Sequence, residues 1–298
     1  MKKWIGVLFL TFLAAVLVAC GENADPNETN GNEEANANEE NEEETGDLSA
    51  EDVYKKAMEA SAEMESAEVE MDMDQTMDSG DGESMKTSTS STMELVMDPV
   101  AFYQEATTSM DMDGEKMDSE TKMYFVDDEM YMHESEMDEW IKMDSGMMGD
   151  LSEMVDQQDP EEQLKIFEDV MSDFEMEETG DTYILEMEAD GDEFTELVQE
   201  FAEENMPPEM LEQMEAEGVD MFEQMEINNV DYEMTLDKES FDIDNLKMDM
   251  DMDMEVEGEN LNTQQNIDMD YISINEVDAI EIPEDVKDEA MDEEEFQE

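Results

Sequence analysis

The stretch KMDMDMDMEVEG (residues 247–258) alternates methionine with acid and then passes into valine. Folded as an α-helix, it would scatter its methionines around the whole circumference, because residues two apart are separated by about 200°. Folded as a β-strand, it sends methionines to one face and acids to the other. The pattern therefore predicts a long strand with one apolar face. The residues on that face are Met248, Met250, Met252, Met254 and Val256.

The same alternation recurs in other parts of the chain. VEMDMDQTM (69–77), for example, places valine, methionines and a glutamine on one face and mainly acids on the other. Six such segments up to residue 143, separated by short polar turns, predict an antiparallel meander. Further strands are expected over 181–190 and, as three long strands, between Ile227 and about Ile282. A faint repeat, ELVMDPVAFY (94–103) against EMTLDKESFD (233–242), favours two halves of one sheet, with chance similarity as the alternative.

Helical spacing of apolar residues marks the remaining segments. The first expected helix covers about residues 49–64, where Ser49 followed by Asp52 is close to a capping box. The tail from Glu284 is also helix-prone. Other helices are expected mid-chain, over 147–158, 159–174, 191–206 and 208–218.

The charge is extreme. The chain of 298 residues carries 94 Asp and Glu against 12 basic residues, all lysine, for a formal charge of −82. Nucleic acid binding is excluded, because affinity for a polyanion rests on basic side chains. Hydrophobic residues still make up 39% of the chain and fall at regular spacing, which argues against disorder. We interpret the acid as a solvated surface suited to high salt, with ion binding as the alternative.

The N-terminus predicts an exported lipoprotein. Residues 1–19 combine two early lysines with an apolar run, as a secretory signal peptide does. The run ends in LVAC, which looks like a lipobox and implies diacylglyceryl transfer to Cys20, the sole cysteine of the chain. A signal anchor with an incidental cysteine is the alternative. Residues 20–47 read as a disordered acidic tether, and 48–298 as one domain. We therefore expect an extracytoplasmic protein anchored to the cell membrane.

Few residues here carry chemistry. Alternation sends thioethers and carboxylates to opposite faces of a strand, which argues against a mixed metal site. His133 is the sole imidazole for a copper site or a catalytic triad, and no nucleophile elbow, P-loop or EF-hand pattern is present. We expect a protein that is not an enzyme, with no cofactor and no metal site.

The methionine face has two interpretations: a plain core filled by adaptable side chains, or a cavity for an apolar ligand. From the residues alone, the plain core is favoured about two to one. The candidate cavity-lining residues are Phe125, Tyr131, Trp140, Met248, Met250, Met252 and Met254.

Taken in order, several loose motifs resemble a known family. They are the lipobox and tether, EDVYKKAMEAS, AFYQE, KMYFVDDEMYMHES, EWIKMD, DPEEQLKIFEDV, YILEMEADGDEF and IEIPEDV. This order resembles uncharacterised lipoproteins of bacilli, classed as a domain of unknown function, over about residues 48–290.

The resemblance implies a LolA-like/LppX-like α+β fold. Such a fold is a strongly curved antiparallel sheet of about 9–11 strands, an open half-barrel whose concave face is covered by helices. Relatives with it carry lipids or lipoproteins between membranes, and only Cys20 is carried over as a site. We expect a monomeric lipoprotein that binds a lipid or other hydrophobic ligand. The alternative is a solid-core structural or interaction lipoprotein, and cation or copper sequestration ranks third.

Overall fold

The described residues form twelve strands, all in one sheet. The computed structural model describes residues 48–80, 82, 84–112, 114–127, 129–135, 139–143, 174–191, 194–195, 225–256 and 259–292. The strands before the mid-chain gap are β1 (Ser66–Ser79), β2 (Ser84–Met97), β3 (Val100–Met112), β4 (Glu115–Val126), β5 (Glu129–Glu134) and β6 (Glu139–Met143). Those after it are β7 (Glu175–Thr179), β8 (Thr182–Asp190), β9 (Met225–Asp237), β10 (Ile243–Val256), β11 (Glu259–Ile274) and β12 (Met291–Asp292).

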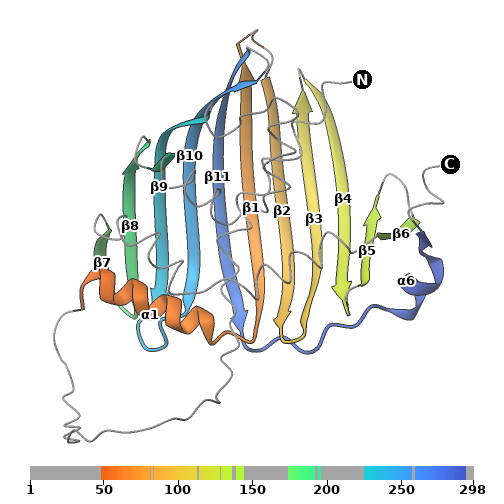
Figure 1. The fold of residues 1–298 in the computed structure, drawn as a ribbon, viewed down its shortest axis with the longest axis horizontal. Helices are drawn as coiled ribbons and strands as arrows, with labels where there is room; N and C mark the ends of the chain where they lie inside the picture. Colours follow the sequence, from red (N-terminus) through yellow and green to blue (C-terminus); the bar gives the residue numbers. More distant parts are fainter. Residues whose placement is uncertain are drawn as a thin grey trace, which may run out of the picture.

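Two meanders meet in the middle of this sheet. The strand order is β12-β6-β5-β4-β3-β2-β1-β11-β10-β9-β8-β7, so the first six strands form one meander and β7–β11 form the other. Antiparallel pairing of β1 with β11 joins the two, and both strands stand at the centre of Figure 1. Only β12 runs parallel to its neighbour, β6. The predicted meander and the long C-terminal strands are confirmed.

The turns use residues suited to tight reversals. The β2–β3 turn contains a cis peptide bond between Asp98 and Pro99. Gly114, between β3 and β4, has a φ of 88°, which is open to glycine at no steric cost. In the β9–β10 turn, the carboxylate of Asp237 accepts hydrogen bonds from the backbone N–H groups of Ser240 and Glu239, at 2.9 and 2.8 Å. These hydrogen bonds lower the pKa of Asp237.

Helix α1 (Ala50–Ala62) begins at the predicted capping box. The Asp52 backbone N–H donates to Ser49 Oγ at 3.1 Å, and the Asp52 carboxylate accepts from the Ser49 N–H at 3.0 Å. The helix lies across one end of the sheet, over the ends of β8–β10 (Figure 1). Its buried residues Val53, Tyr54 and Ala57 join the core of the sheet there.

The segment after β11 runs along the same end of the sheet toward the opposite edge (Figure 1). Asn275, at a φ of 60°, ends β11, and its side-chain oxygen accepts from the Glu65 and Ser66 N–H groups at 2.6 and 3.2 Å. Helix α6 (Glu284–Glu289) follows, and Ile282 and Val286 pack against Tyr131. The segment thereby ties the central strands to the β5–β6 edge.

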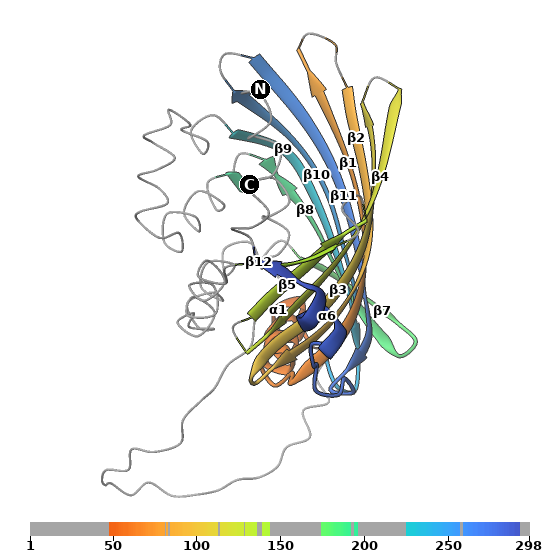
Figure 2. The same cartoon turned by 90° about the vertical axis from the view of Figure 1, so that its right-hand side faces the viewer.

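The predicted α+β half-barrel with helices over a concave face is wrong. The described residues are nearly all β, in a curved sheet that stays open at β7 and β12 (Figure 2). Helix α1 lies at one end of the sheet and α6 at the β6 edge, so neither covers a face. The expected helices over 147–158, 159–174 and 208–218, and most of 191–206, lie outside the described residues. In the part of the chain that is described, no helix is long and apolar enough to cross a membrane.

Candidate ligand-binding face

The methionine face is the side of β1 and β8–β11 onto which Met248 and its alternate neighbours project. Cross-strand register places Met248 between Tyr232 and Ile267, and Met250 beside Val230. Directly opposed side chains on neighbouring strands lie about 4.5–5.5 Å apart, so these rows form a largely apolar surface. Met248, Met250, Met252 and Met254 are 8%, 5%, 1% and 6% exposed.

Aromatic rings mark the α1 end of this face. Tyr54 of α1 stacks on Phe174 with ring centroids 5.6 Å apart, and Phe174 meets the edge of Tyr232 at 6.1 Å. Burial, helped by the nearby hydroxyls of Tyr54 and Tyr271, raises the pKa of Tyr232 well above its ordinary value. Aromatic contacts therefore attach α1 to the sheet at this end, together with Lys56 Nζ, which lies 5.0 Å from the centroid of the Phe241 ring.

The opposite side of the same strands is the acidic face, where carboxylates are held by amide side chains. Asp251 accepts from the amide nitrogens of Asn228, Asn262 and Gln264 at 2.9, 3.0 and 3.2 Å. Partial burial opposes the ionisation of Asp251, but these three donors outweigh it and lower its pKa. We call Asn228, Asn245, Asn262, Gln264 and Asn266 the amide ladder, because each donates across strands to a carboxylate.

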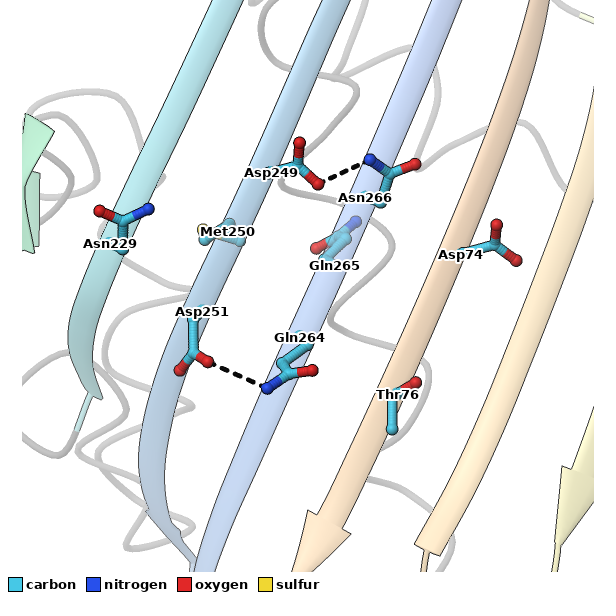
Figure 3. Close-up of a pocket in the computed structure, with 9 residues that line it drawn as sticks. All are labelled: Asp74, Thr76, Asn229, Asp249, Met250, Asp251, Gln264, Gln265 and Asn266. Atoms are coloured by element: carbon cyan, nitrogen blue, oxygen red, sulfur yellow. Dashed lines mark hydrogen bonds between the residues drawn. The ribbon is translucent and has the colours of Figure 1, made fainter. Parts of the chain in front are cut away.

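An open hollow of about 350 Å³ lies on the acidic face (Figure 3). Two bonds of the amide ladder cross it, from Asn266 to Asp249 at 2.6 Å and from Gln264 to Asp251. Within the described ranges, no three His, Cys, Asp or Glu side chains are grouped to hold a metal ion. The lining residues are Asp74, Thr76, Asn229, Asp249, Met250, Asp251, Gln264, Gln265 and Asn266.

Comparison with known proteins identifies the family. The sequence pattern of a family of unknown function, DUF6612, matches residues 49–291. The chain belongs to this family. Membership of a family of unknown function was expected from the motif order, and it is confirmed, whereas the assignment to bacilli stays a prediction. No curated protein matches the DUF6612 chain.

Two solved structures share a distant similarity with the DUF6612 chain. LprF from Mycobacterium bovis has 9% identity and a TM-score of 0.37, over 78% of this chain and 96% of that one. A β-barrel-like protein of the domain of unknown function DUF1849 from Brucella abortus has 8% identity and a TM-score of 0.20, over 72% and 100%. Similarities this weak carry no argument about this chain, so the LolA-like/LppX-like relationship stays a prediction.

The predicted lining residues of the DUF6612 chain do not share one surface. Phe125 is on the same side of the sheet as the four methionines, stacked on Phe102 at 5.5 Å. Five strand spacings separate it from β10, or about 24 Å at about 4.8 Å per strand. Tyr131 and Trp140 alternate onto the other side of the sheet, because β5 and β6 turn Met130, Met132 and Ile141 toward the methionine side.

Tyr131 and Trp140 instead belong to an aromatic cluster on the far side. The rings of Tyr103 and Tyr124 stack with their centroids 4.4 Å apart. The ring centroid of Trp140 lies 5.7 Å from that of Tyr124 and 5.2 Å from that of His133. Tyr131, 3% exposed, is covered by Ile282 and Val286. The structure therefore does not bring these two residues together with the four methionines. The sequence EMYMHE (residues 129–134) already indicates this placement. Tyr131 stands between Met130 and Met132, and neighbouring residues of a strand point to opposite sides of the sheet.

Two kinds of candidate functional residue remain. Cys20, the predicted lipidation site, lies outside the described residues. Sequence reasoning did not single out three polar residues within the methionine face: Gln75, Thr263 and Gln265, which are 6%, 1% and 5% exposed. In the sequence, these three are polar residues at positions where the alternating pattern predicts apolar ones.

Proposed function

We propose that this protein is a non-enzymatic lipoprotein that binds a lipid or other hydrophobic ligand on its methionine face. The observation that carries the proposal is the extent of that face, which crosses five neighbouring strands and includes a row of four methionines on β10. Methionine is flexible and polarisable, so a surface made of it adapts to apolar ligands of varied shape. Leucine or valine would pack a fixed core at least as well.

The anchor follows from the N-terminal sequence. Cys20 follows Leu17-Val18-Ala19 at the end of an apolar run, and the acidic segment up to residue 47 separates it from the folded domain. We expect diacylglyceryl attachment to the Cys20 sulfur, and a monomer held at the extracytoplasmic face of the cell membrane. A flexible coil of this length spans roughly 30 Å, and repulsion between its carboxylates extends it further.

A solid-core structural or interaction lipoprotein is the second candidate. The burial of Met252, at 1% exposed, favours it, because a side chain with so little open surface is already packed on all sides. The two candidates differ in one measurable property, the presence of a noncovalent ligand.

Native mass spectrometry of the protein purified from its own membranes tests the proposal. A carrier is expected to show a noncovalent lipid in addition to the covalent adduct on Cys20. The Cys20→Ser variant is the matched control, because it removes the covalent lipid and leaves the methionine face unchanged. Repeated recovery of both proteins without a noncovalent lipid would overturn the carrier function and leave the solid-core lipoprotein.

A further inference from the structure

Three polar side chains form a small cluster inside the methionine face, here called the polar centre. Gln75 on β1 lies directly opposite Gln265 on β11, and Thr263 is two residues along β11 on the same face. Residues two apart on a strand lie roughly 6.6–6.8 Å apart, so one small chemical group can reach all three. Met250 and Met252 flank the polar centre on β10, opposite Gln265 and Thr263.

The polar centre is short of hydrogen bonds. Gln75 Nε2 and Thr263 Oγ1 are buried with no hydrogen-bond partner. Within the part of the chain that the structure describes, Gln265 Nε2 donates to the sulfur of Met73, at 3.3 Å, and to no other acceptor; a thioether is a weak acceptor. A buried donor without an acceptor opposes folding, so such groups are rare in native proteins and call for a physical explanation.

The amide ladder shows what the same residue types do when no ligand is involved. On the acidic face, Asn262 and Gln264 donate to carboxylates across the strand. Gln265 follows Gln264 in the sequence but lies on the other face, and it has no oxygen acceptor among the described residues. Packing does not explain the difference, because methionine would fill the site of Gln75 and valine that of Thr263 with no unmet donor. The unmet donors fit an acceptor supplied from outside the chain.

We propose that the polar centre binds an uncharged hydrogen-bond acceptor, the carbonyl oxygen of an ester or amide within an otherwise apolar ligand. The amide N–H of Gln75 and the hydroxyl of Thr263 donate to that oxygen, while Met250 and Met252 contact the adjoining chain. This inference rests on the proposed function and adds the chemical class of the ligand to it.

A charged head group does not fit this position. The chain has no arginine, and Lys247 of β10 lies on the acidic face, 2.9 Å from Glu233. Across the described parts of β1, β10 and β11, no lysine alternates onto the methionine face. A carboxylate or phosphate buried here would lack a counter-ion, and burial of an unpaired charge is far more unfavourable than burial of a carbonyl.

Competition between an ester and its ether analogue tests the inference. The full-length protein is equilibrated with equal amounts of 1-monooleoylglycerol and 1-O-oleylglycerol, which differ only in the carbonyl, and occupancy is read by native mass spectrometry. We expect the ester to be favoured about tenfold, the effect of satisfying one buried donor. Gln75→Met and Thr263→Val each reduce the preference toward one, whereas Thr76→Val, on the opposite face, leaves it unchanged. Thermal melting of each variant verifies that it is folded.

Each outcome bears on the inference. Equal binding of ester and ether by the unaltered protein overturns the inference that the polar centre binds a carbonyl oxygen, but it leaves the proposed function standing. Binding of neither overturns both. An ester preference that survives Gln75→Met and Thr263→Val also overturns the inference, as does tighter binding of oleate than of the neutral ester. A lost preference in these two variants alone, with bound lipid retained, supports it.

Discussion

Replacement of Asn262 by aspartate tests whether the amide ladder holds the acidic face together. Asn262 Nδ2 donates to Asp251 at 3.0 Å and to Asp253 at 3.1 Å. The isosteric Asn262→Asp change removes both bonds and brings a third carboxylate to the same spot. Bonds to charged acceptors contribute about 1.5–3 kcal/mol each when sequestered, but partial exposure reduces this to a fraction. Adding about 1 kcal/mol of repulsion gives an expected loss of about 2 kcal/mol in the free energy of unfolding.

Urea unfolding followed by circular dichroism measures this loss, because urea is uncharged and salt can be varied independently. At 1 M NaCl the Debye length is about 3 Å, so the repulsive part fades and the loss falls to about 1 kcal/mol. Asn260→Asp is the matched control: it adds the same charge to the same face of β11, at an exposed position opposite Glu255. The reasoning is refuted if both variants lose equal stability, or if salt leaves the loss for Asn262→Asp unchanged.

Three further predictions concern the acid and the core. The folded pKa of Asp251 is lower than its ordinary value of 3.8, so its stabilisation is present above that pH and is lost as pH falls through the folded pKa. Gln264→Ala raises this pKa in a carboxyl-carbon NMR titration, and an unchanged midpoint would contradict the assignment. Met252→Ala lowers stability by about 2–5 kcal/mol, whereas Met117→Ala, 47% exposed, changes it by less than about 0.5. The melting temperature rises from about 0.1 M to 1 M NaCl as repulsion is screened, and a flat response would remove the high-salt interpretation.

Local alternation made the strands predictable. The stretch 247–258 lies mostly within β10, and its methionines are buried as expected. The segments up to residue 143 form the meander β1–β6, and the aligned repeat falls on equivalent hairpins, β2–β3 and β9–β10. These features depend on the alternation of side chains along each strand and on the turn residues, and both can be read from residues close together in the sequence.

Features that depend on distant residues could not be predicted. The pairing of β1 with β11 and the attachment of α6 to the β6 edge follow from tertiary contacts. Strand β7 was missed because its letters, EMEET, follow directly after an expected helix. The last long strand was expected to reach Ile282, but β11 ends at Ile274. The side-chain oxygen of the next residue, Asn275, accepts hydrogen bonds from the backbone N–H groups of Glu65 and Ser66.

Among the candidate residues, the four methionines and Phe125 lie on one side of the sheet, whereas Tyr131 and Trp140 lie on the other. Tyr131 and Trp140 alternate with Met130, Met132 and Ile141 along β5 and β6, so the same alternation rule assigns them to the other side. The alternating pattern shows Gln75, Thr263 and Gln265 as polar interruptions, but it does not show that the hydrogen-bond donors of Gln75 and Thr263 lack partners. The importance of the polar centre becomes visible only when burial and hydrogen-bond partners are known.

The pairing of β1 with β11 also sets an order on folding. Gln75 and Gln265 face each other although 190 residues separate them, so the central seam closes only after nearly the whole chain has been made. Until then, one side of β1 presents open backbone N–H and C=O groups, which invite pairing with another chain. Strand β1 carries three aspartates, Asp72, Asp74 and Asp78. Like charges on these residues repel other copies of the same acidic chain, which opposes such pairing.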